Sequence, residues 1–179
     1  NNLETRMVDQ LKDLAENHHV CGVKAEFEAE GTRFEEALRL KEVVTKAGLD
    51  LTIKIGGCEA LKDMYDARSI GVTHIVAPMI ESAYALKKFL GCARVAYPAD
   101  EFGSMAFLIN IETITACEHI EDLLNRYDIT GLRGIVIGRV DLTGSMGLTR
   151  EDANSETIAA LVRRVLVAPT IRFILFLDD

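Results

Sequence analysis

Short apolar runs alternate with amphipathic segments along the whole sequence, and this alternation is the strongest constraint on the fold. The helical patterns cover 32–48, 58–71, 81–90, 116–128 and 150–167, and 93–98 is either a short strand or an irregular crossing. The runs predicted as strands cover 20–28, 49–57, 72–80, 104–113, 132–141 and 170–177. A repeat of roughly 25 to 30 residues per strand and helix is typical of βαβ units, which form a parallel sheet.

Individual residues support these boundaries. Thr32 is a candidate N-cap, and Glu35 three residues later completes a capping-box pattern. Gly48 and Gly71 stand where the first two predicted helices end, as C-terminal glycines commonly do. The pattern therefore predicts helices that begin and end between the apolar runs.

The fold class predicted from this pattern is α/β, a TIM-type (β/α)8 barrel. Nearly continuous apolar strands are expected where helices cover a parallel sheet or a barrel closes. A dinucleotide-binding G-x-G-x-x-G after the first strand and a Walker A motif are both absent from the sequence, which disfavours a doubly wound nucleotide-binding fold. Because eight strands usually take about 250 residues, we expect the barrel of this 179-residue chain to be incomplete or truncated in its C-terminal part.

We treat 1–179 as one barrel domain and suspect that residues are missing around 166–171, where a helix meets a strand almost without connection. The net charge of −8 and the lack of a basic cluster argue against a nucleic-acid or anionic-membrane partner. The charged N-terminus lacks the apolar stretch of a secretory signal, and no apolar run approaches a membrane span. A cytoplasmic protein is the expectation.

Two acidic residues, Glu112 and Asp141, end successive apolar strands. In parallel α/β folds the chemistry gathers at the carboxyl ends of strands. A buried carboxylate is costly unless it is compensated, and Mg²⁺ or Mn²⁺ held by one or two carboxylates would compensate it. The alternative is that both acids cap helices. Gly144 and Gly147 favour the metal site, because a glycine-rich loop lets backbone amides approach a small anion.

Charged residues also mark the first two strands. Lys24, Glu26, Glu28 and Glu30 alternate and therefore share one face of an extended strand, while the second strand carries Lys54. The lysines either pair with the glutamates in a structural network or bind a substrate carboxylate or enolate oxygen. A third possibility is that Lys24 or Lys54 forms a Schiff base.

Several motifs together resemble one enzyme family. The segments INIET (109–113) and GIVIGRVDLTGSMG (134–147) are similar to those of the 4-hydroxy-2-oxoheptanedioate aldolase/citrate lyase beta-subunit family, which are pyruvate-type TIM barrels. GVTHIVAPMIESAYAL (71–86) and EAEGTRFEEALRLKEVVTKAGL (28–49) resemble earlier parts of the same family.

The resemblance implies a carbon–carbon lyase that acts on a 2-oxo acid through a pyruvate-type enolate, with Mg²⁺ or Mn²⁺ held by Glu112 and Asp141. Lys54 is then the predicted catalytic contact, with Glu28 or Glu30 as base. Lys24 and the backbone of Gly138, Arg139 and Val140 complete the predicted substrate-binding set. Homo-oligomers are common in the family and are expected here.

The sequence departs from the family pattern at three positions. Lys54 stands where an arginine is usual, Glu30 where a histidine is frequent, and Arg139 where proline is usual. These departures keep open an altered barrel that binds a sugar acid or a partner protein without turnover. A Schiff-base aldolase that uses Lys24 or Lys54 is the other alternative.

Overall fold

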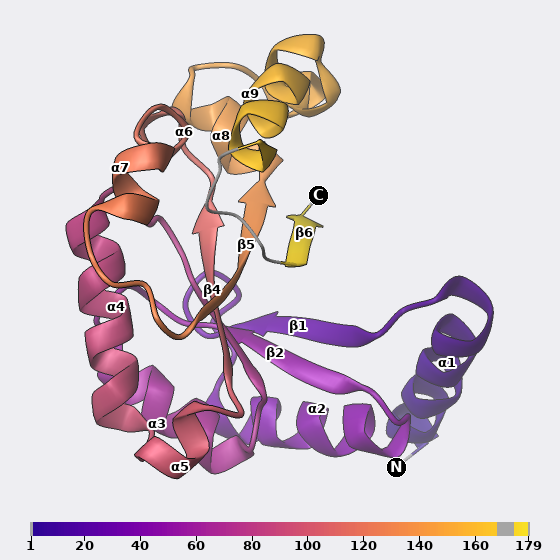
Figure 1. Cartoon of the computed structure of the whole chain (residues 1–179). Helices are drawn as coiled ribbons and strands as arrows, with labels where there is room; N and C mark the ends of the chain where they lie inside the picture. The colour runs from indigo at the N-terminus through magenta and orange to yellow at the C-terminus, as the bar shows by residue number, and fades with distance from the viewer. Residues whose placement is uncertain (1, 168–173, 179) are drawn as a thin grey trace.

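A computed structural model describes residues 2–167 and 174–178 (Figure 1). The strands are β1 (Gly22–Glu26), β2 (Asp50–Lys54), β3 (His74–Ala77), β4 (Ala106–Ile111), β5 (Leu132–Gly138) and β6 (Ile174–Asp178). The helices are α1 (Asn2–His18), α2 (Phe34–Lys46), α3 (Leu61–Ile70), α4 (Ala83–Ala96), α5 (Ala99–Phe102), α6 (Ile114–Glu118), α7 (Ile120–Asn125), α8 (Arg139–Ser145), the 3₁₀ helix η1 (Arg150–Asn154) and α9 (Glu156–Leu166).

The strands form one parallel sheet in the order β1-β2-β3-β4-β5-β6. Consecutive parallel strands joined by helices are the arrangement of a TIM-type barrel, and the described residues hold six of its strands. The predicted fold class is thereby confirmed. Most of the suspected gap around 166–171 falls in 168–173, which lie outside the described residues.

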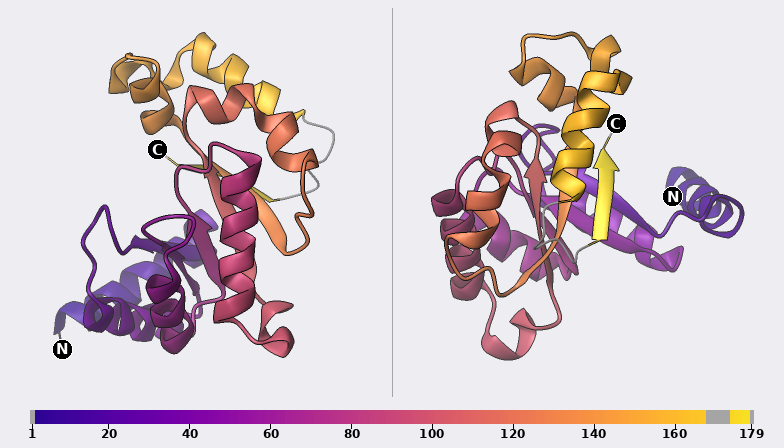
Figure 2. Two further views of the ribbon diagram at one scale, coloured as in Figure 1. Left: turned by 90° about the vertical axis from the view of Figure 1, so that its left-hand side faces the viewer. Right: turned by 45° about the horizontal axis from the view of Figure 1, so that its top comes forward.

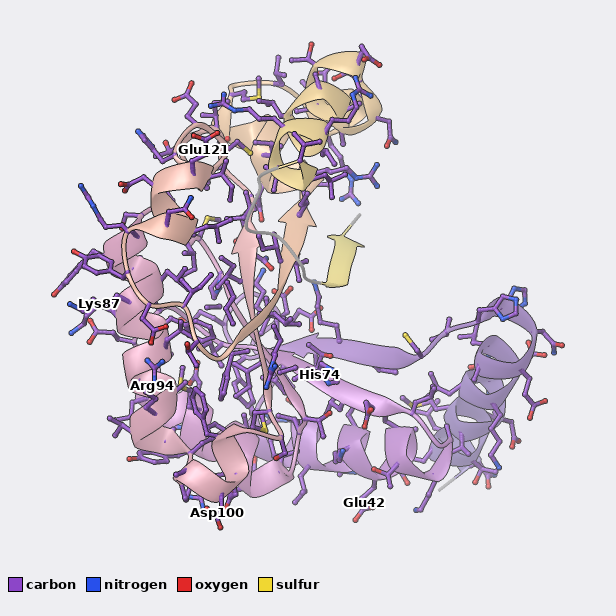
Figure 3. The ribbon with its side chains drawn as sticks, viewed as in Figure 1. Glu42, His74, Lys87, Arg94, Asp100 and Glu121 are labelled. Carbon is purple, nitrogen blue, oxygen red and sulfur yellow. The ribbon has the colours of Figure 1, made fainter. Side chains whose placement is uncertain are left out.

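Alternate residues of β3, β4 and β5 face two different environments. One face packs against the helices in the main core, where Phe107, Ile109 and Ile111 of β4 are fully buried. Val76, Leu108 and Val136 form a separate cluster on the opposite face. Figure 1 shows α2, α3, α4 and α7 along one side of the curved sheet. In Figure 3 the labelled Glu42 of α2 and Lys87 of α4 lie on the outer side of these helices, away from the sheet.

Several predicted boundaries were wrong because packing decided them. Residues 93–96 continue α4 instead of forming a short strand or an irregular crossing, since Phe89, Ala93 and Ala96 keep the helical spacing of buried positions. The segment 116–128 divides into α6 and α7, and 150–167 divides into η1 and α9. The sequence pattern also missed α1, which contributes no buried residue.

The first capping prediction was shifted by one position, whereas the glycine predictions hold. Arg33 is the N-cap of α2, and its backbone N–H donates to Glu36 at 3.0 Å, so Thr32 and Glu35 do not form the cap. Gly71 ends α3 in the left-handed region at φ 77°, and Gly48 lies two residues beyond α2 at φ 78°.

The carboxyl end of β5 leads into a cap of short helices. The left view of Figure 2 shows α8 and α9 beyond this end of the sheet, with α1 at the opposite end of the molecule. None of the helices in the described ranges is long and apolar enough to cross a membrane.

Candidate active site

A pocket of 210 Å³ opens at the carboxyl ends of the strands. Its walls come from β1, β2, the ends of β4 and β5, and the start of α8. The lining residues are Glu26, Ala29, Lys54, Glu112, Gly138, Arg139, Val140 and Asp141. The pocket thus gathers both predicted metal ligands, the predicted catalytic lysine and three predicted substrate-binding residues.

Glu112 is the most constrained residue of this pocket. It follows β4 directly and lies on the same strand face as Leu108 and Asn110, opposite the helix-packed core. Only 2% of it is exposed. Asn110 Nδ2 donates to Oε2 at 2.6 Å, and the backbone N–H of Met79 donates to Oε1 at 2.8 Å. Both oxygens are therefore fixed in direction, and each keeps further acceptor capacity.

Met79 reaches Glu112 from the loop after β3. The backbone φ angle of Met79 is +51°, in the left-handed region that residues other than glycine rarely adopt. Its side chain is half exposed, so the strained backbone is not explained by burial of the methionine. The conformation aims the peptide N–H at the Glu112 carboxylate.

Burial dominates the electrostatics of Glu112. Desolvation raises the pKa of this carboxyl group, while the hydrogen bonds from Met79 and Asn110 and the charge of Lys54 oppose the rise. The negative charge of Asp141 raises the pKa of Glu112 further. Glu112 therefore lies in a position where a positive ligand would stabilise its ionised form.

Gly138 allows β5 to pass close to this carboxylate. A Cβ atom at position 138 would lie 2.8 Å from both Cβ and Oε2 of Glu112. Real side chains essentially never come so close, so a residue without a side chain is required here for steric reasons alone.

Asp141 lies in α8, not at the end of a strand in a glycine-rich loop as predicted. β5 ends at Gly138, and Arg139–Ser145 is helical. Side chains hold this helix: Thr143 Oγ1 donates to the carbonyl of Val140 at 2.6 Å, and Ser145 Oγ accepts from the backbone N–H of Ile114 at 2.9 Å. The loop prediction was wrong because Gly144 is accommodated within the helix, and Gly147 at φ 72° lies just after it.

Glu26 joins the two lysines of the first strands. Its Oε1 lies 3.3 Å from Nζ of Lys24 and 3.2 Å from Nζ of Lys54, all three on the inner face of the sheet. Lys54 lines the pocket with its side chain 13% exposed, whereas Lys24 lines a separate cavity toward the amino ends of the strands. The pairing predicted as a structural network is therefore present at the edge of the site.

Glu28 and Glu30 do not line the pocket. β1 ends at Glu26, so the strand alternation on which their shared face was predicted stops there. Glu30 Oε2 accepts from the backbone N–H of Glu26 at 3.1 Å, and Glu28 lies against Gly56 in the loop after β2. Both acids support the rim beside the pocket.

Arg139 and Val140 form the wall between this pocket and a second one. The Arg139 guanidinium donates to Oδ1 of Asn154 in η1 at 2.5 Å. The side chain of Arg139 thus turns toward η1, and the backbone of residues 138–140 stays beside Glu112.

Sequence reasoning did not assign two residues to the site, Glu26 and Asn110. Glu26 was recognised in the alternating set but not assigned to the pocket, because the end of β1 was placed too late. Asn110 interrupts the apolar run AFLINI two positions before Glu112, and this polar residue at inward spacing was the available signal.

The donor set suits a hard divalent cation. Glu112 and Asp141 supply carboxylate oxygens, which Mg²⁺ and Mn²⁺ prefer, and Asp141 is exposed to the pocket. Among the side chains of residues 2–167, no three His, Cys, Asp or Glu residues gather closely enough to hold a metal ion. Two carboxylates with water and substrate oxygens in the other positions are a common ligand set for Mg²⁺.

Solved structures share this fold. The chain resembles the citrate synthase SbnG at TM-score 0.79 and 15% identity, covering 96% of this chain and 73% of that one. An HpcH/HpaI aldolase from Desulfitobacterium hafniense DCB-2 resembles the chain at TM-score 0.78 and 17% identity, and the match covers 96% of this chain and 74% of that one. An HpcH/HpaI aldolase/citrate lyase family protein from Burkholderia cenocepacia J2315 resembles it at TM-score 0.75 and 13% identity, and the match covers 100% of this chain and 93% of that one.

At these identities the structural likeness establishes the fold alone, and no curated protein sequence matches the chain. The sequence itself matches the family model described as HpcH/HpaI aldolase/citrate lyase over residues 33–177. This match spans most of the chain and includes every residue of the pocket except Glu26 and Ala29. The chain therefore belongs to the HpcH/HpaI aldolase/citrate lyase family.

Proposed function

We propose that this chain is a divalent-cation-dependent carbon–carbon lyase that acts on a 2-oxo acid through a pyruvate-type enolate. The observation that carries the proposal is the buried, doubly hydrogen-bonded carboxylate of Glu112, which shares a pocket with Asp141 and Lys54. A buried acid with raised pKa beside a second acid is costly unless the site has a cationic ligand.

Glu112 and Asp141 hold Mg²⁺ or Mn²⁺ in this proposal. The bound cation supplies Lewis-acid stabilisation of the negative charge that develops on the enolate oxygen. Lys54 binds the substrate carboxylate, and Glu26 restrains the lysine by its salt bridge. The backbone of residues 138–140 seats the ligand against Glu112.

In the cleavage direction, an acid of the 26–30 segment accepts the proton of the 4-hydroxyl group. The C3–C4 bond then breaks, its electron pair passes into the pyruvate enolate, and an aldehyde leaves. The same acid returns the proton to C3 of the enolate to give pyruvate. Glu26 is the acid of this segment that lines the pocket, whereas the predicted bases Glu28 and Glu30 lie beside its rim.

The Schiff-base alternative requires a neutral amine as nucleophile. Both lysine Nζ atoms are instead engaged in salt bridges with Glu26, and this pairing counts against that alternative. We also propose that the chain assembles as a homo-oligomer, in line with the expectation from its family.

Exchange of the pyruvate methyl protons in D₂O tests the proposal without knowledge of the aldehyde. We expect Mn²⁺ or Mg²⁺ to promote exchange, followed by NMR, and chelator to abolish it. Glu112→Gln and Asp141→Asn should each lower Mn²⁺ affinity and exchange, while the exposed-site control Glu121→Gln should retain both. Unaltered Mn²⁺ affinity in both site variants would reject the ligand assignment, and exchange that survives chelator would reject the metal-dependent mechanism.

A further inference from the structure

Helix α1 is 17 residues long and contributes no residue to the buried core. It packs against α2, where the Arg39 guanidinium forms an ion pair with the Glu4 carboxylate. Figure 1 shows α1 at the edge of the molecule, beside α2. Helices in proteins owe most of their stability to the packing of an apolar face. A helix with so little packing has room for a further contact on its exposed side.

Uncharged residues follow a heptad spacing along one side of α1. Intervals of four and three residues separate Leu3, Met7, Gln10, Leu14 and Asn17, which we call the heptad stripe. This is the spacing of the a and d positions at which two helices of a coiled coil meet. Leu3 is 62% exposed and Leu14 is 39% exposed. The stripe therefore has the spacing of a helix–helix contact while its two leucines still face solvent.

An apolar groove of 260 Å³ lies beside the heptad stripe, between α1 and α2. Leu3 and Met7 of the stripe line it together with Leu40 and Val43 of α2. A second helix laid along the stripe would cover this groove as well, and the apolar surface buried in this way would stabilise the contact.

Two charged residues, Arg6 and Asp13, flank the heptad stripe on the side away from α2. Both are exposed, and both occupy the g position of the heptad, directly before Met7 and Leu14. Charges at such flanking positions set the partner and the orientation of paired helices. One helix thus carries both members of an opposite-charge pair, seven residues apart.

A two-fold axis between two antiparallel copies of α1 brings these features together. Leu3 then faces Leu14 of the partner subunit, and the g positions of the two helices lie side by side. Arg6 lies next to Asp13 of the partner subunit, and the symmetry repeats this pair. A parallel alignment would instead place each g position beside an e position, which sets Arg6 against Leu11.

We propose that α1 is the contact between two copies of this chain, formed as an antiparallel helix pair. This inference rests on the homo-oligomer of the proposed function and names its contact surface. It does not depend on the carbon–carbon lyase activity, because α1 lies at the opposite end of the molecule from α8 (Figure 2, left). The charge pattern favours a second copy over an unrelated protein, since the surface is complementary to itself.

Sedimentation equilibrium of the full chain measures the dimer dissociation constant. We expect Leu14→Gln to raise it about 100-fold, because the symmetry removes two leucines from the contact. Arg6→Glu and Asp13→Arg should each raise it about tenfold, since each brings like charges together twice. The double variant Arg6→Glu/Asp13→Arg restores opposite charges and should regain most of the affinity. Lys12→Glu is the matched control, an equal charge change at an exposed position opposite the heptad stripe, and should have no effect.

The outcomes separate the contact from the rest of the proposal, with circular dichroism to check that each variant keeps its helices. A wild-type dissociation constant in Leu14→Gln would overturn the α1 contact alone, whereas a monomeric wild-type chain would reject the homo-oligomer as well. A double variant no tighter than the single ones would overturn the antiparallel pairing. Dimers that Leu14→Gln dissociates, without metal-dependent exchange of pyruvate protons, would support the contact and reject the lyase mechanism.

Discussion

Gly138 and Glu112 lie so close that a single methyl group at position 138 would overlap the carboxylate, with 2.8 Å between the new Cβ and Oε2. Asn110 and Met79 fix the same carboxylate from two other sides. The position of Glu112 is therefore determined by contacts from β4, from the end of β5 and from the loop after β3.

Gly138→Ala should displace the Glu112 carboxylate and lower Mn²⁺ affinity by about 10- to 100-fold, as loss of groups that orient metal ligands typically does. Calorimetric titration with Mn²⁺ measures the effect. Gly91→Ala in α4 is the matched control, because its new methyl group meets no heavy atom within 4 Å. Wild-type affinity in Gly138→Ala would contradict the steric account.

Lys54→Gln should slow metal-dependent exchange of the pyruvate methyl protons by about 10²-fold, the usual cost of removing one stabilising group from an active site. Lys54→Arg should recover part of the rate, because the positive charge returns. Lys62→Gln, at an exposed lysine paired with Asp66, serves as control. Equal exchange rates in Lys54→Gln and wild type would remove Lys54 from the proposed mechanism.

The raised pKa of Glu112 predicts a pH dependence of stability in chelator. The folded protein retains the Glu112 proton to a higher pH than the unfolded chain, so this group stabilises the fold fully only below the unfolded pKa of about 4.5. Its contribution is lost as pH rises through the folded pKa. Relative to Glu112→Gln, the wild-type free energy of unfolding should therefore fall between pH 4 and neutrality, as followed by urea denaturation. Parallel curves for the two proteins would contradict the shift.

Thiol labelling should distinguish Cys21 from Cys117. Cys21 is exposed, whereas Cys117 is buried and burial raises the pKa of its thiol to about 11. Iodoacetamide at pH 8 should alkylate Cys21 first and Cys117 only on unfolding, since the thiolate is the reactive form. Peptide mass spectrometry locates the adducts, and Cys21→Ser should lose the fast phase. Fast labelling of Cys117 in folded protein would argue against its placement in the core.

The fold and part of the site could be predicted from the sequence, because both depend on the pattern of hydrophobic residues along the chain. Apolar runs such as 106–111 identify parallel strands, and an acid directly after such a run, as at Glu112, identifies the carboxyl end where chemistry gathers. Glu112 and Asp141 were identified in this way, and Lys54 was identified as a charged residue of the second predicted strand; all three line one pocket.

The remaining differences depend on where regular structure stops. The alternation of charged and apolar residues continues in the sequence to Glu30, but β1 ends at Glu26. Glu26 therefore lines the pocket in place of Glu28 and Glu30. Glycines and small residues after Gly138 indicate a loop by local propensity. Hydrogen bonds from Thr143 and Ser145 hold that segment as a helix, and such contacts become visible only in three dimensions.

The left-handed backbone of Met79 sets a limit on how stable this protein can become without loss of function. Such a conformation costs a residue with a side chain on the order of 1 kcal/mol or more. Met79→Gly would relieve the local cost and at the same time loosen the peptide that aims its N–H at Glu112. Selection for thermostability and selection for an accurately aimed carboxylate therefore act in opposite directions at this one position.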